Sequence, residues 1–167
     1  MPARLAVTRR RTLYFLGAGA STLLAGPALA SAATASAVPL EVWKDPNCGC
    51  CQDWIAHMQA NGFHARIHNS GNQAMRSKLG LPPELGSCHT AWVAGYVIEG
   101  HVPAADVHQL LRQQPKALGL SVPGMPIGSP GMDGPAYGGR RDPYDVLLVT
   151  QALFGRGVST RVFTSYR

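Results

Sequence analysis

Three cysteines lie within four positions, at Cys48, Cys50 and Cys51, in the stretch DPNCGCCQDW. The run before them, residues 40–44, is short and apolar, and Pro46 ends it because the residue before a proline resists helical geometry. After the cysteines, apolar side chains recur at helical spacing over two turns. The sequence therefore predicts a strand, a turn and a helix whose N-terminus carries the three thiols.

The first 37 residues differ in composition from the rest of the chain. They carry the basic run TRRRTL at 8–13, a mildly apolar stretch at 13–30, and small-x-small sites at 28–30 and 35–37. This order is typical of a secretory signal, and the Arg pair indicates the twin-arginine type, which exports folded proteins. We predict that residues 1–37 are a cleaved signal peptide and that residues 38–167 form one periplasmic domain. The alternative, an uncleaved membrane anchor, would need roughly 20 apolar residues, and the stretch barely reaches that length.

Removal of this leader changes the net charge. Four of the 15 Lys and Arg residues lie in the leader and none of the nine acidic residues do, so the mature chain carries a net charge of +2. A basic stripe with interleaved aromatic residues is not present in the sequence, so nothing points to a nucleic-acid partner. The mature form is not expected to be embedded in a membrane.

The remaining elements follow from apolar spacing and from turn residues. We predict an α/β fold with the element order β-α-β-α-β-β-α, then a long Pro/Gly-rich loop at 123–139 and C-terminal strands. The later elements are a strand at 63–68, a short helix at 72–79, a hairpin at 90–99, a helix from 103, and strands at 144–150 and 158–164. This order is that of a thioredoxin-like mixed sheet with flanking helices. In that plan the start of the hairpin, which carries Cys88, packs against the loop with the first cysteines.

Redox chemistry is one use of these cysteines. Cys48 and Cys51 have Cys-x-x-Cys spacing at a helix N-terminus, which lowers thiol pKa values and gives a reactive dithiol. A periplasmic thiol-disulfide oxidoreductase that uses Cys48 and Cys51 is therefore the alternative function. Two features count against it: Cys50 is a competing thiol inside the motif, and Cys88-His89 lies where such enzymes keep a cis-proline.

Structural disulfides are a second use, because export places an even number of cysteines in an oxidising compartment. Cys48–Cys51 together with Cys50–Cys88 is a possible pairing. However, a chain with room for a full core has little need of two cross-links at one point.

Metal binding is the third use, and it employs all four thiols. Thiolates favour soft or borderline ions such as Cu(I) or zinc. One tetrahedral zinc ion could take three cysteines and His89, but three thiols within four residues suit several Cu(I) ions bridged by sulfur. We therefore predict a copper site, with zinc the weaker candidate.

Two methionines in the Pro/Gly-rich loop, Met125 and Met132, extend the set of soft ligands. Their alternative role is to fill gaps over the core. His101, which follows a glycine before a helix, is not included in the predicted ligand set.

The motifs resemble one known family. In order, they are DPNCGCCQDW, PPELGSCHTAWVAGYVIEGHVPAADVHQLL, GLSVPGMPIGSPGM and PYDVLL. Together they are similar to the CopG-like periplasmic copper-resistance proteins, over roughly residues 40–150. The resemblance implies a thioredoxin-like fold and copper bound by Cys48, Cys51 and Cys88.

Further ligands implied by the resemblance are Cys50, and less directly His89, Met125 and Met132. The implied function is sequestration of Cu(I) for copper resistance and homeostasis. It includes interconversion of Cu(I) and Cu(II), or transfer of copper to other periplasmic copper-handling proteins, and it assigns no catalytic residue.

Overall fold

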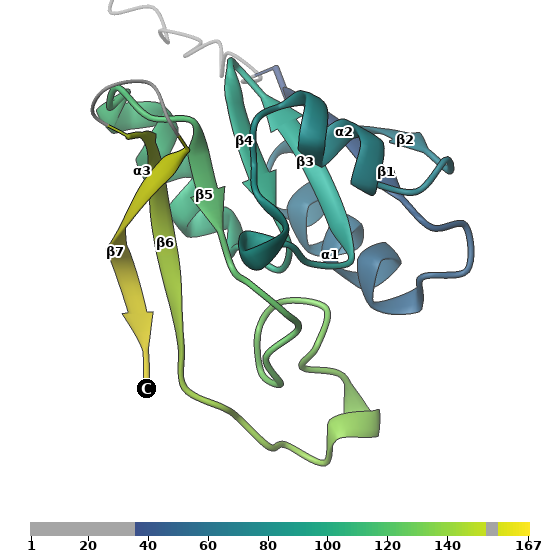
Figure 1. The fold of residues 1–167 in the computed structure, drawn as a ribbon. Helices are drawn as coiled ribbons and strands as arrows, with labels where there is room; N and C mark the ends of the chain where they lie inside the picture. The colour runs from purple at the N-terminus through teal and green to yellow at the C-terminus, as the bar shows by residue number, and fades with distance from the viewer. Residues whose placement is uncertain (1–35, 153–156) are drawn as a thin grey trace, which may run out of the picture. The chain divides into compact units, whose positions relative to one another are not determined.

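The computed structural model describes residues 36–152 and 157–167, and these residues form an α/β structure, as predicted (Figure 1). Its elements, in chain order, are β1 Val38–Lys44, α1 Gly49–Ala60, β2 Phe63–His68, α2 Gln73–Lys78, the 3-10 helix η1 Pro83–Leu85, β3 His89–Val93, β4 Tyr96–Glu99, α3 Ala104–Gln113, β5 Gly119–Ser121, the 3-10 helix η2 Pro135–Tyr137, β6 Tyr144–Gln151 and β7 Val158–Tyr166.

The seven strands of the described residues form one mixed sheet in the order β2-β1-β3-β4-β5-β6-β7. β1 and β2 are parallel because α1 carries the chain back across the sheet, and β3 is antiparallel to β1. β3 and β4 form the predicted hairpin, which turns at Ala94 and Gly95, both with positive φ. The predicted order of the first seven elements is thus confirmed, and the name thioredoxin-like stays a prediction from that order.

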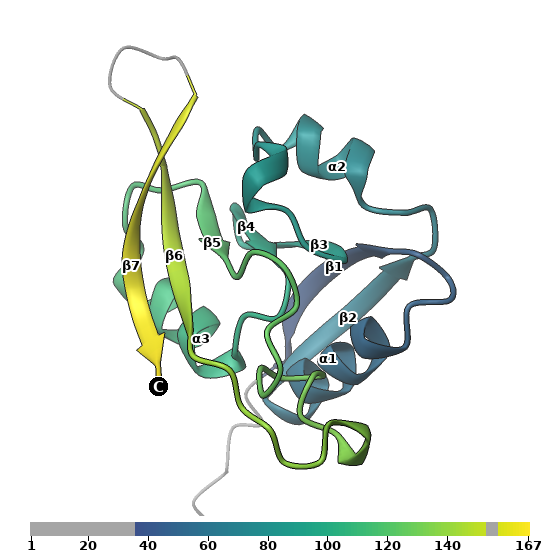
Figure 2. The ribbon, with the colours of Figure 1, turned by 60° about the horizontal axis from the view of Figure 1, so that its bottom comes forward.

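The helices lie on opposite faces of the sheet. α1 and α3 cover one face and α2 lies on the other (Figure 2). On the first face Trp54, Ile55 and Met58 of α1 pack in the main core with α3, and all three are fully buried. The helical spacing seen in the sequence is therefore the face of α1 that meets the sheet, which leaves the first turn of α1 free to carry the cysteines.

β5 was not predicted, because it is only three residues long and begins with a glycine. Gly119 allows β5 to approach β4 closely: a Cβ there would lie 1.8 Å from the backbone oxygen of Val97. The predicted late strands are present as β6 and β7, and they pair antiparallel as a hairpin. Asp106 of α3 ties β7 to the helix by accepting hydrogen bonds from Thr164 Oγ1 at 2.6 Å and Tyr166 Oη at 2.7 Å.

The Pro/Gly-rich loop contains no strand, as predicted, but it does contain the short 3-10 helix η2, which was not predicted. The loop reaches back to α1, since Gly131 packs against the backbone of the first turns of that helix (Figure 2). The predicted signal peptide falls almost wholly on residues 1–35, which lie outside the described residues. Among the residues that are described, no helix has the length and apolar character needed to span a membrane.

Candidate metal centre

The loop between β1 and α1 places the first cysteine at the start of the helix. Cys48 is the N-cap of α1, and its Sγ accepts a hydrogen bond from the backbone N–H of Cys51 at 3.3 Å. The turn before it is held by Lys44, a buried lysine whose Nζ donates to the backbone oxygens of Asp45 and Pro46. The sulfur of Cys48 therefore takes the capping role that serine or aspartate oxygens usually fill, at the positive end of the helix.

The fourth cysteine arrives from a distant part of the chain. Cys88 directly precedes β3, and its Sγ lies 3.9 Å from the Sγ of Cys50, which in turn is 3.6 Å from the Sγ of Cys48. The Sγ atoms of all four cysteines lie within 4.8 Å of one another. The predicted convergence of Cys88 with the early cysteines is therefore present in the structure.

The four sulfurs are in two oxidation states. Cys48 and Cys51 form a disulfide, whereas Cys50 and Cys88 are free thiols. Of the two disulfides considered from the sequence, the first is formed and Cys50–Cys88 is not. In this state only two of the four sulfurs can become thiolate ligands, because a disulfide sulfur has no proton to lose.

Two imidazoles also face Cys88. His101 Nε2 lies 3.1 Å from Cys88 Sγ, while its Nδ1 lies 2.8 Å from the backbone oxygen of Pro130. A carbonyl accepts but cannot donate, so Nδ1 carries the hydrogen and the Nε2 lone pair points at the sulfur. Metal-binding histidines are commonly oriented in this way by a backbone carbonyl.

His89 lies on the other side of the same sulfur. Its Nδ1 is 3.4 Å from Cys88 Sγ, and its ring packs against Trp54 with centroids 4.2 Å apart. Burial, followed by the nearby His101, lowers the pKa of His89 well below its ordinary value, and burial also lowers the pKa of His101. Both rings are therefore neutral at pH 7, the form that binds metal ions.

Similarity to known proteins matches this geometry. The family described as "Protein of unknown function, DUF411" matches residues 85–132. The solved structure titled "Copper resistance protein copG- Form 2" is 42% identical, with a TM-score of 0.69, and the match covers 78% of this chain and 99% of that chain. The structure titled "Copper resistance protein copG- Form 1" is 44% identical, with a TM-score of 0.68, and covers 78% and 98%. Comparison with curated proteins gives no match.

The chain belongs to the CopG copper-resistance family. A cluster of four cysteines within this family fits copper binding.

In this CopG-family chain His101 is the neighbour of Cys88 that sequence analysis left out of the predicted ligand set. Its role depends on the carbonyl of Pro130, 29 residues away, which no local pattern reveals. The one available signal was its position just after β4, the hairpin partner of the strand that begins at His89.

The two predicted methionine ligands have different surroundings. Met132 is 9% exposed and its Sδ accepts a hydrogen bond from Tyr137 Oη at 3.3 Å, whereas Met125 is 50% exposed. Their roles as copper ligands stay predictions. Gly131, next to Met132, lies so close to α1 that an added Cβ would be 2.6 Å from the backbone oxygen of Cys50. The loop therefore closes over the start of α1.

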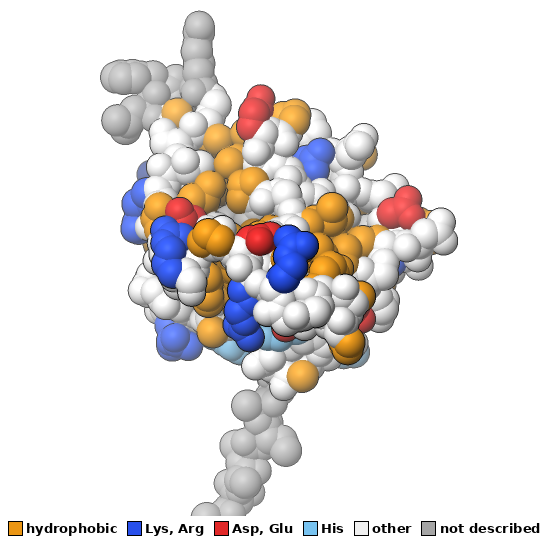
Figure 3. Space-filling view, turned by 90° about the horizontal axis from the view of Figure 1, so that it is seen from below, with side chains coloured by type: hydrophobic (Ala, Val, Ile, Leu, Met, Phe, Trp, Pro, Cys, Tyr) orange, Lys and Arg blue, Asp and Glu red, His pale blue; other side chains and the backbone are white. Residues whose placement is uncertain are grey.

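The two imidazoles of this centre are buried beneath the molecular surface. Seen from below, Lys and Arg side chains are dispersed among hydrophobic and uncharged ones, and histidine occupies only a small area (Figure 3). His89 and His101 are both fully buried, while Cys48, Cys50 and Cys88 are half-buried. Cys48, Cys50 and Cys88 therefore form the accessible side of the centre, and the imidazoles, together with the buried Cys51, form its inner side.

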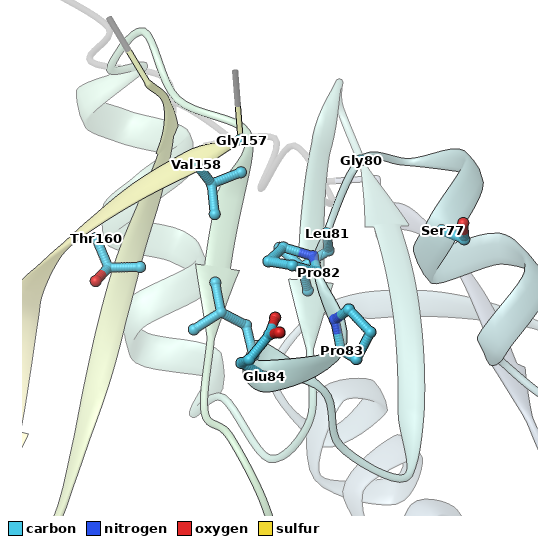
Figure 4. A pocket seen from close by; sticks show the side chains of 10 residues that line it. Ser77, Gly80, Leu81, Pro82, Pro83, Glu84, Gly157, Val158 and Thr160 are labelled. Carbon is cyan, nitrogen blue, oxygen red and sulfur yellow. The ribbon is translucent and has the colours of Figure 1, made fainter. Parts of the chain in front are cut away.

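A separate cavity of about 560 Å³ lies away from the cysteines, between the 77–85 segment and the start of β7 (Figure 4). Leu81, Pro82, Pro83 and Val158 give it apolar walls, and Glu84 is the ionisable side chain that lines it. This lining lacks the thiol and imidazole donors that characterise the metal centre.

Proposed function

We propose that this protein is a periplasmic copper-binding protein that holds Cu(I) through its four cysteines and so contributes to copper resistance and homeostasis. The observation that carries the proposal is the meeting of four sulfurs, from the N-terminus of α1 and the start of β3, within 4.8 Å of one another. Family membership supports copper as the cargo, and the soft sulfur donors favour Cu(I) over zinc.

The spacing of the two free thiols suits a shared ion. Metal–thiolate bonds of about 2.3 Å drawn from two sulfurs 3.9 Å apart meet at an angle of about 116°, close to the trigonal value. An ion could therefore bridge Cys50 and Cys88 without movement of the backbone. His101 Nε2 is placed to serve as a further ligand to the Cys88 side of the cluster.

Reduction of the disulfide must come before full loading. Two electrons and two protons from a dithiol reductant convert the Cys48–Cys51 disulfide into two thiols, and the reductant leaves as a disulfide. The four sulfurs can then bridge several Cu(I) ions. The N–H of Cys51 and the N-terminus of α1 stabilise a thiolate at Cys48.

Copper must also displace a proton. Burial, and next the neighbouring Cys50, raise the pKa of the Cys88 thiol to about 12, so this thiol is protonated in the copper-free protein. Binding of Cu(I) releases that proton, and affinity should therefore fall in acid.

The test is anaerobic titration of the reduced mature protein with Cu(I), with copper stoichiometry and thiol count measured together. Cys48→Ser and Cys88→Ser should each lose most of the bound copper. His64→Gln, which changes an exposed strand histidine, is the matched control and should keep it. Full copper stoichiometry in both cysteine variants would end the proposal.

The Cys48–Cys51 disulfide favours a second candidate function, thiol-disulfide exchange. This function predicts that the metal-free protein turns over insulin or glutathione disulfides, with dependence on Cys48 and Cys51 but not on Cys88. Loss of turnover in Cys88→Ser would count against it.

Export to the periplasm is tested separately, by fractionation of cells that express the full chain with and without Arg9 and Arg10 replaced by lysine.

A further inference from the structure

Glu99 is a carboxylate with no exposed surface, at the end of β4. Its Oε1 accepts hydrogen bonds from the backbone N of Ser87 at 2.8 Å and from Arg76 Nη1 at 3.1 Å. Its Oε2 accepts from Thr90 Oγ1 at 2.6 Å. A buried carboxylate is costly unless its oxygens are fully paired, and here the donors come from three separate segments of the chain.

Arg76, together with Asn72, also holds the other backbone group of Ser87. The oxygen of Ser87 accepts from Asn72 Nδ2 at 3.1 Å and from Arg76 Nη1 at 3.3 Å. Residues 86–88 belong to no helix or strand, so sheet hydrogen bonds do not fix them. The side chains of Glu99, Asn72 and Arg76 thus supply the backbone partners that a strand would otherwise provide.

The residue after Glu99 presses against the same point. Gly100 has a φ of +72°, and a Cβ there would lie 2.6 Å from both Cβ and Oγ of Ser87. This contact keeps the Glu99–His101 segment directly against the segment that carries Cys88. One arrangement therefore fixes both partners of the 3.1 Å contact between Cys88 Sγ and His101 Nε2.

We propose that Glu99 is a positioning residue for copper binding: by fixing Ser87 it holds the Cys88 sulfur within reach of Cys50 and His101. This inference rests on the proposed copper-binding function. Well-packed apolar residues often replace a buried ion pair without loss of stability, so stability alone does not account for a fully hydrogen-bonded carboxylate here. The hydrogen bond that Glu99 accepts from the backbone N–H of Ser87 accounts for it.

The test probes the position of the Cys88 sulfur in the absence of copper, through the rate at which Cys88 forms a disulfide with Cys50. In a Cys48→Ser/Cys51→Ser background only Cys50 and Cys88 remain, and serine can also cap α1. Oxidised glutathione then converts the two thiols into a Cys50–Cys88 disulfide and leaves as two molecules of glutathione. The rate of the ring-closing step depends on how well the two sulfurs are held together.

Glu99→Gln in this background should slow formation of the Cys50–Cys88 disulfide by about tenfold, because a misplacement of the order of 1 Å can cost up to 100-fold in a positioned reaction. The matched control is Asp106→Asn, which alters another buried carboxylate that holds β7 to α3. It should lower stability but leave the rate unchanged. Equal rates in folded Glu99→Gln and in its parent would overturn the inference.

If Glu99→Gln fails to fold, Asn72→Ala and Arg76→Met remove one donor each from the same network, and each should slow the reaction by a smaller factor. Unchanged rates in both would overturn the inference equally. Copper titration of Glu99→Gln with all four cysteines present should show weakened Cu(I) binding. Because the disulfide assay contains no copper, failure of the copper-binding proposal would leave its result intact, and the two failures can be distinguished.

Discussion

Gly131 has no side chain, and the space that a Cβ would need is already filled by the backbone of α1. A Cβ would lie 2.6 Å from the oxygen of Cys50 and 2.7 Å from the nitrogen of Trp54, and the φ of Gly131 is +84°. We expect Gly131→Ala to lower the free energy of unfolding by about 1–3 kcal/mol, from backbone strain and from the contact with the helix. It should also weaken retention of Cu(I), because the loop must lift from the first turn of α1.

The control for this prediction is Gly138→Ala in the same loop. Gly138 also has a positive φ, +61°, but nothing lies within 4 Å of its Cβ position. Chemical denaturation and competition with a Cu(I) chelator would compare the two variants. Equal copper retention by Gly131→Ala and Gly138→Ala would show that the loop does not close the centre.

At the scale of elements, α1 and α3 are joined by a histidine that sequence analysis did not single out as structural. The Nε2 of His57, on α1, accepts a hydrogen bond from the backbone N–H of Ala104, the first residue of α3, at 3.0 Å. Burial lowers the pKa of His57 below its ordinary value, against a smaller opposing effect of Asp133. A protonated imidazole cannot accept this hydrogen bond, so acid should weaken the junction between the helices.

The sign of the pH effect follows from the lowered pKa. The folded protein binds this proton less readily than the unfolded chain, so His57 contributes stability that is present above a pH of about 6.5 and is lost as pH falls below it. In His57→Gln, which keeps an acceptor but does not titrate, the denaturant midpoint should fall less between pH 7 and pH 5 than in the wild type. His64→Gln should behave as wild type. A pH-independent difference between His57→Gln and wild type would contradict this assignment.

The elements differ in how far the sequence could predict them. α1 follows from apolar spacing at Cys51, Trp54, Ile55 and Met58, all of which are buried on one face. The nearness of Cys88 to that helix required the order of the elements as a whole, because no local pattern links positions 38 residues apart. β5 was missed because its pairing depends on a close approach at Gly119 that becomes visible only when β4 lies beside it.

The same reasoning explains what could be predicted of the metal centre. The four cysteines could be grouped because three lie together in the sequence and the order of the elements brings Cys88 to them. His101 and Glu99 could not be placed, because their roles depend on a loop carbonyl and on the backbone of residue 87. The Cys48–Cys51 disulfide was half of the one pairing named from the sequence, which was not the favoured interpretation.

At the scale of the whole molecule, the two oxidation states of the cysteines should differ in copper binding and in stability. The disulfide closes a very short loop, with a sequence separation of 3. On the chain-entropy model its loss therefore costs at most about 2 kcal/mol. The main core cluster includes neither Cys48 nor Cys51, the two residues that reduction changes, so we expect the reduced, copper-free protein to stay folded with a modestly lower melting temperature.

Once the disulfide is reduced, copper binding should restore the stability that its loss removed and add more. Cu(I) held jointly by the start of α1 and by Cys88 binds the folded protein and not the unfolded chain, whose two segments are far apart. At a free copper concentration 100 times the dissociation constant, such linkage stabilises the folded state by about 2.7 kcal/mol. Anaerobic thermal unfolding with buffered Cu(I) should show a clear rise in melting temperature for the reduced wild type and a smaller one for the disulfide form. Reduced Cys50→Ser/Cys88→Ser, which keeps only the two cysteines of α1, separates the two contributions: a rise equal to that of the wild type would mean that copper is bound within one segment and does not join the two.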